Sequence, residues 1–127
     1  MKTLKSTSLL LLSIPALSIA QLYGVSHGSA GMDTLYTINT TTGAATAVFS
    51  FANGGSINTS ELAYNPVTNK LITIQTVSAF QSRLVEIDHV AMTATAVSHG
   101  IPTNFFEGVE YSSSLGGLVV GYGPGGF

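Results

Sequence analysis

The chain has no cysteine and no tryptophan, and charged residues make up only 8% of its 127 residues. Without cysteine it can form no disulfide, so its stability has to come from strand packing, a ligand or association. The formal net charge is -2, and no basic patch is available to neutralise nucleic-acid phosphates or anionic lipid headgroups. We therefore expect neither nucleic acid nor a membrane surface as a partner.

The N-terminus has the composition of a secretory signal peptide. Lys2 and Lys5 supply positive charge, and an apolar stretch follows over residues 9–14. Small residues at the end of this segment predict cleavage between Ala20 and Gln21. A membrane anchor or a buried helix is the alternative, but the apolar stretch is too short to span a bilayer of roughly 30 Å.

The chain therefore divides into a signal peptide over residues 1–20 and a mature region over residues 21–127. We expect the mature region to be secreted, or periplasmic in a Gram-negative host. Asn39 and Asn58 each begin an N-glycosylation acceptor tripeptide in a predicted loop. Such matches arise by chance in a chain rich in threonine and serine, and a bacterial host would usually ignore them, so glycosylation stays open.

The mature region contains an internal repeat with a period of about fifty residues. Residues 35–48 return in altered form as residues 84–97, and residues 62–74 are echoed by residues 109–121. The positions shared by the first pair include Leu35 with Leu84, Ile38 with Ile87, Thr46 with Thr95 and Val48 with Val97. Turns as well as strands match, which argues against a coincidental duplication in an ordinary sandwich.

Short apolar runs separated by glycine, asparagine and proline predict strands joined by tight turns. Outside the signal peptide no apolar pattern of helical period lasts two turns, so no helix is expected. Each repeat holds four strands, which predicts a four-stranded antiparallel meander. The expected strands cover residues 22–26, 34–39, 45–51, 61–65, 71–76, 83–88, 93–98, 108–112 and 118–122.

This unit resembles the blades of secreted β-propellers of the NHL and YVTN types, and of exported proteins whose blades read Leu-Tyr-x-Ile-Asp-x-x-Thr-Gly. The matching elements are Leu35-Tyr36-Thr37-Ile38-Asn39 with Thr42-Gly43, and Leu62-Ala63-Tyr64-Asn65-Pro66 with Leu71-Ile72-Thr73-Ile74. The resemblance implies an all-β fold of four-stranded antiparallel blades, incomplete at about two blades, with an inner strand over residues 61–65. The chain would then hold three strands of one blade, one whole blade and two strands of the next.

A propeller needs at least four blades to close. On this reading the chain does not close alone, and its terminal strands expose unpaired edges. We therefore expect self-association through these edges, or a longer parent chain that supplies the missing blades.

Two turns depart from the repeat. Met92 stands where the first copy has Gly43, and we expect that turn to take another conformation. Ser112-Ser113 replaces Asn65-Pro66 in the last hairpin, which weakens the signal that ends its first strand.

Few residues suggest chemistry. Asp88 and His89 are adjacent, but Asp88 occupies the position at which Asn39 opens a turn, so we predict a turn cap. His27, Asp33 and His99 are assigned to loops, and their spacing fits no zinc pattern. No serine lies in a Gly-x-Ser-x-Gly elbow, and the chain has no thiol nucleophile.

Glu61, Glu107 and Glu110 lie at or beside the expected inner strands. The resemblance to lactonase-type propellers makes them weak candidates for ligands of a calcium ion in a central channel, although calcium takes six or more oxygens. We expect no cofactor, with calcium as the alternative. The predicted function is a secreted, non-catalytic module that binds a protein or glycan ligand or plays a structural role. A fragment of a propeller hydrolase or lactonase, completed by absent blades, is the alternative.

Overall fold

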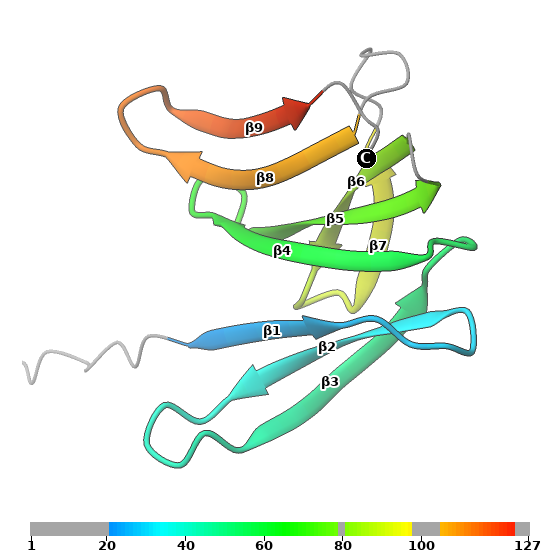
Figure 1. The fold of residues 1–127 in the computed structure, drawn as a ribbon. Coiled ribbons are helices and arrows are strands. Elements are labelled where there is room, and N and C mark those ends of the chain that lie inside the picture. Colours follow the sequence, from blue (N-terminus) through cyan, green and yellow to red (C-terminus); the bar gives the residue numbers. More distant parts are fainter. Residues whose placement is uncertain (1–20, 79–80, 98–104, 124–127) are drawn as a thin grey trace, which may run out of the picture.

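The computed structural model describes residues 21–78, 81–97 and 105–123, and these residues form strands and turns with no helix (Figure 1). The all-β prediction is therefore confirmed. The strands are β1 (Leu22–Ser26), β2 (Met32–Ile38), β3 (Ala45–Ala52), β4 (Asn58–Asn65), β5 (Lys70–Ser78), β6 (Gln81–Asp88), β7 (Thr93–Val97), β8 (Phe105–Ser112) and β9 (Gly117–Gly123). The predicted signal peptide, with Ala20, and His99 lie outside the described residues. The described part of the chain has no helix long and apolar enough to cross a membrane.

The strands form three antiparallel sheets in chain order. The first sheet is β1-β2-β3, the middle sheet is β4-β5-β6-β7 and the last sheet is β8-β9. This division into three, four and two strands is the one that the resemblance implied, with a four-stranded meander that begins with β4. Figure 1 shows the middle sheet lying between the other two.

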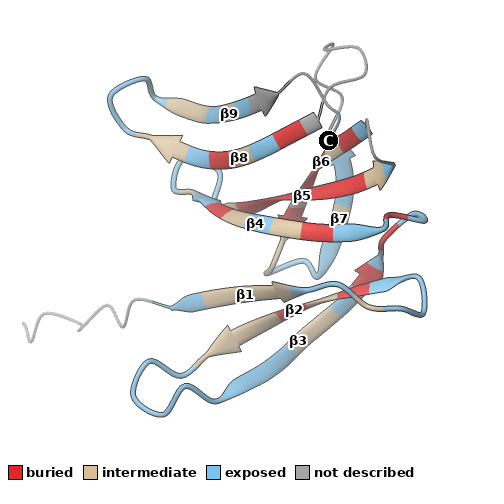
Figure 2. Cartoon of the chain, viewed as in Figure 1, coloured by how far each residue is buried: buried red, intermediate tan, exposed pale blue. Residues whose placement is uncertain are grey.

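Two apolar clusters hold the three sheets together. The cluster between the first and middle sheets consists of Leu35, Phe51, Leu71, Val85 and Ile87. The cluster between the middle and last sheets consists of Ala63, Ile72, Ile74, Leu84, Phe106 and Val109. Because successive strand residues point to opposite faces, β5 contributes to both clusters. It is buried from Leu71 to Thr76, as the colouring of Figure 2 shows.

Four hairpin turns, those that follow β2, β4, β6 and β8, share one geometry. Each opens with a side-chain oxygen that accepts backbone N–H groups two or three residues ahead, the arrangement of an Asx or serine turn. The acceptors are Asn39, Asn65, Asp88 and Ser112. The fifth residue of each turn has a positive φ: Gly43 at 73°, Asn69 at 56°, Met92 at 57° and Gly116 at 65°.

The prediction of another conformation at Met92 was therefore wrong. The pairing of β6 with β7 and the cap from Asp88 hold Met92 in the left-handed region that Gly43 adopts. The last hairpin likewise closes in the common geometry, although Ser112 and Ser113 replace asparagine and proline.

Candidate functional site

The described residues concentrate their buried polar groups around Asp33. Asp33 lies near the start of β2, two residues before Leu35, and the side chains of both residues are fully buried. Strand alternation places the two side chains on the same inward face. A carboxylate buried in this way is costly unless hydrogen bonds replace the water that it has lost.

Four donors surround the Asp33 carboxylate. His27 Nδ1 lies 3.0 Å from Oδ1, and the Gly28 N–H donates to the same oxygen at 3.4 Å. Thr59 Oγ1 and Gln75 Nε2 donate to Oδ2 at 2.5 and 2.7 Å. A carboxylate only accepts, which assigns the ring proton of His27 to Nδ1. Two donors come from the β1–β2 loop and two from the middle sheet, so one carboxylate joins the two sheets.

Further hydrogen bonds link Gln75 through Arg83 and Asn53 back to Gly28. Gln75 Oε1 accepts from Arg83 Nε at 2.8 Å and from Arg83 Nη2 at 2.6 Å. Arg83 Nη2 also donates to the backbone oxygen of Asn53 at 2.6 Å, and Asn53 Nδ2 donates to the backbone oxygen of Gly28 at 3.2 Å. We call His27, Asp33, Asn53, Thr59, Gln75 and Arg83 the Asp33 network.

Gly54 lies beside this network. Its φ is +56°, and a Cβ at that position would lie 2.1 Å from Arg83 Nη2. A larger residue would therefore push the Arg83 guanidinium group away from Gln75 and Asn53, in a backbone conformation that glycine adopts most readily.

The network has one feature of a catalytic site. Asp33 orients the His27 ring, and about a quarter of the His27 side chain (27%) is exposed. This is how a carboxylate orients a general base in hydrolases. Within the described residues, however, no hydroxyl group is hydrogen-bonded to this ring.

The sequence did not predict this site. Asp33 was assigned to a loop, but it belongs to β2, and the structure brings it together with His27. The available signal was the position of Asp33 two residues before a core leucine, which places an acidic side chain on the buried face of a strand. Its partners in β4, β5 and β6 depend on how the sheets pack and leave no local pattern.

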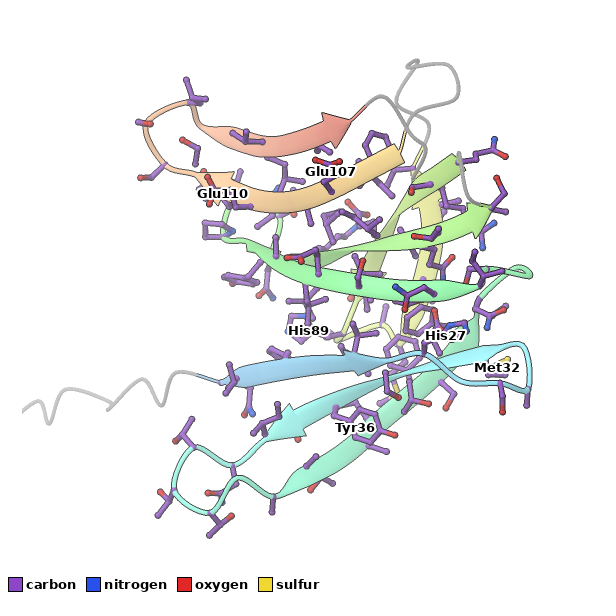
Figure 3. The ribbon with its side chains drawn as sticks, viewed as in Figure 1. His27, Met32, Tyr36, His89, Glu107 and Glu110 are labelled. Carbon is purple, nitrogen blue, oxygen red and sulfur yellow. The ribbon has the colours of Figure 1, made fainter. Side chains whose placement is uncertain are left out.

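The three candidate calcium ligands are exposed. Glu61 is the extra residue of a β-bulge in β4, with φ 56°, and Glu107 lies in the corresponding irregularity of β8. Glu107 and Glu110 lie apart along β8 in Figure 3. The described residues contain no group of three or more histidine, aspartate or glutamate side chains that could hold a metal ion. The calcium alternative stays a prediction.

Asp88 caps its turn as predicted, accepting from Ala91 N at 2.8 Å and Val90 N at 3.1 Å. These backbone hydrogen bonds, that of Ala91 first, lower the pKa of Asp88 below its ordinary value. The neighbouring His89 ring packs on Tyr23 of β1, with ring centroids 5.0 Å apart. His89 is labelled in Figure 3, beside β1. The pair adds a contact between the first sheet and the turn that follows β6.

The asparagines of the two predicted N-glycosylation tripeptides, Asn39 and Asn58, are both exposed. Asn39 opens the β2–β3 turn, where its side-chain oxygen accepts from Thr41 N. Asn58 was expected in a loop, but it is the first residue of β4 because it pairs with Thr76 of β5.

A shallow groove of about 480 Å³ lies at the turn end of the first sheet. Gln21, Thr37, Asn39 and Thr46 are among its lining residues, and none of the lining residues is charged. Its surface offers hydroxyl and amide groups and no acid, base or nucleophilic pair.

Comparison of the chain with models of protein families, with curated proteins and with solved structures found no match. The function therefore has to be argued from the geometry of the chain itself.

Proposed function

We propose that this chain is a secreted, non-catalytic β-propeller-type repeat protein that acts as a binding or structural module. The propeller reading is supported by three sheets packed face to face in chain order and by a repeat of about fifty residues. Secretion is supported by the composition of residues 1–20.

The observation that carries the non-catalytic reading is how the Asp33 carboxylate is used. Its two oxygens have about four acceptor sites, and four donors, two from the β1–β2 loop and two from the middle sheet, occupy them. Asp33 is also fully buried. The Asp33 carboxylate therefore joins the two sheets and is not free to act on a substrate.

The partners that fit this proposal are a protein or glycan ligand, together with other strands. In the described residues, β1 pairs only with β2 and β9 only with β8. Free backbone edges of this kind bind further strands. Self-association, or a longer parent chain, would supply them.

Incubation of the purified chain with a panel of lactones and glycosides tests the non-catalytic reading. We expect no saturable hydrolysis. Saturable turnover by the wild-type chain that disappears in a His27→Gln variant would overturn the proposal, because it would assign chemistry to the imidazole that Asp33 orients. His89→Gln is the matched control, since it removes the other described imidazole.

A second candidate is a propeller hydrolase or lactonase whose site is completed by residues outside this chain. The exposed part of His27, held by a buried carboxylate, favours it. This candidate predicts that Glu61→Gln leaves any turnover unchanged while His27→Gln abolishes it. A turnover that depends on Glu61 and on added calcium would instead favour the metal-dependent form of this candidate.

A further inference from the structure

The connection between β3 and β4 carries the chain from the first sheet to the middle sheet (Figure 1), and it contains the dipeptide Asn53-Gly54. Asparagine followed by glycine is prone to deamidation, because glycine has no side chain to shield its backbone nitrogen. That nitrogen bonds to the side-chain carbon Cγ of the asparagine, and ammonia leaves as a succinimide ring closes. Water then opens the ring to give aspartate or isoaspartate.

Every polar group of Asn53 has a hydrogen-bond partner in the folded chain. Its side chain donates from Nδ2 to Gly28 O at 3.2 Å and accepts at Oδ1 from Gly55 N at 3.1 Å. The partners of its backbone groups are Gly31, Ser56 and Arg83. Asn53 is also only 2% exposed. Ring closure removes Nδ2 as ammonia and turns Cγ toward the Gly54 nitrogen, so both side-chain hydrogen bonds oppose it.

The glycine side of the dipeptide is open to water. Gly54 and Gly55 are both exposed, and both have a positive φ. The contact that holds this connection against the middle sheet comes from Arg83, which donates to Asn53 O and to Gln75 Oε1. Gln75 in turn donates to Asp33. Local opening of the Asp33 network, and not access of water, therefore limits the reaction.

Deamidation changes both charge and hydrogen bonding where the two sheets meet. A carboxylate only accepts, so an aspartate at position 53 loses the donation to Gly28 O and sets two acceptors against each other. It also adds a negative charge close to Asp33, since the Gly28 N–H donates to that carboxylate. Isoaspartate in addition lengthens the backbone of the connection by one methylene group.

We propose that Asn53 is a deamidation site which the Asp33 network protects, and that its conversion to aspartate or isoaspartate detaches the first sheet from the middle sheet. Opening of the network exposes Asn53 to reaction, and the product keeps the network open. The change runs in one direction, because the ammonia is lost to solvent.

The rate is measured on the purified full-length chain in H₂¹⁸O buffer at mildly alkaline pH. Peptide mass spectrometry then detects the solvent oxygen that enters on hydrolysis of the ring. A synthetic peptide of residues 50–57 gives the rate without the fold. We expect Asn53 to react at least about tenfold more slowly in the chain than in the peptide, since reaction follows the population of the open form.

Arg83→Met should bring the rate in the chain closer to that in the peptide. Lys70→Met is the matched control, because it removes a cation at the turn end of β5 that pairs with Glu86 instead. Far-ultraviolet circular dichroism checks that both variants keep their strands, and Arg83→Lys replaces Arg83→Met if it does not. Equal rates in chain and peptide, no reaction in the peptide, or equal rates in the two variants would each overturn the protected site.

Asn53→Asp carries the product from the start and tests the detachment separately. We expect its amides in β1, β2 and β3 to exchange hydrogen faster than those of the wild type. Asn39→Asp is the matched control, since Asp88 caps the equivalent turn with a carboxylate, and it should leave exchange unchanged. Equal protection of the first sheet in both variants would show that a carboxylate at position 53 does not detach it.

Discussion

The fifth residue of the hairpin turns that follow β2, β4, β6 and β8 has a positive φ, and at Met92 that residue carries a long side chain. A non-glycine residue in the left-handed region costs roughly 1–2 kcal/mol. The Met92 side chain is 58% exposed and contributes little packing. We expect Met92→Gly to raise the free energy of unfolding by about 1 kcal/mol, less the entropy that glycine adds to the unfolded chain. Urea denaturation measures the change.

The matched control for this change is Gly43→Met at the equivalent turn. It should lose stability by a similar amount, because nothing lies within 4 Å of a Cβ at Gly43 and only the backbone conformation opposes the substitution. Equal stability of all three proteins would mean that these turns tolerate positive φ without cost.

Asp88 makes one turn sensitive to acid. Its pKa is lowered in the folded state by the hydrogen bonds from Ala91 and Val90. A lowered folded-state pKa adds stability above the unfolded value, and that stability is lost as the pH falls through the folded value. Asn39 caps its own turn without a titrating group. We expect Asp88→Asn to retain the cap and to lose less stability than wild type between pH 6 and pH 3.

Urea unfolding of both proteins across this range gives the difference directly, since the remaining carboxylates are common to both. Parallel pH profiles would show that the Asp88 cap is not charge-dependent. Asp88→Ala is the comparison that removes the cap itself, and it should be less stable than both at pH 6.

At the scale of elements, Asp33 in β2 and Ser82 in β6 align in the predicted repeat but differ in their hydrogen bonds. Asp33 accepts four hydrogen bonds across two sheets, whereas Ser82 Oγ is buried with no partner. Asp33→Ala leaves the donors Thr59 and Gln75 buried and unpaired. We expect it to cost about 3 kcal/mol or more, and Ser82→Ala to be neutral or slightly stabilising.

Amide hydrogen exchange shows which strands the Asp33→Ala substitution destabilises. In Asp33→Ala the amides of β1, β2 and β3 should lose protection before those of β5 and β6, because the network joins the first sheet to the middle one. Uniform loss of protection would show that the three sheets unfold together and that Asp33 is one core contact among many.

The strands and turns could be predicted from sequence because their signals are local. Alternating apolar residues mark strands, and asparagine, aspartate and glycine mark the hairpin turns. The Asp33 network could not be predicted, because it brings together Asp33, Thr59 and Gln75 from three strands of two sheets. The bulge at Glu61 was likewise hidden, since a bulge is a property of the pairing between two strands.

At the scale of the whole molecule, the described chain presents a free edge at β9. Over Gly117–Gly123 this edge carries no charge and no proline, and Val119 is 36% exposed on it. Uncharged edges associate with other strands, and a lysine there opposes pairing.

We expect the apparent molar mass of the purified chain to rise with concentration in light scattering, with strand signal kept in far-ultraviolet circular dichroism. Val119→Lys should shift the chain toward monomer, whereas Val67→Lys, on an exposed turn, should not. If both variants retain the wild-type mass at every concentration, association does not use the β9 edge.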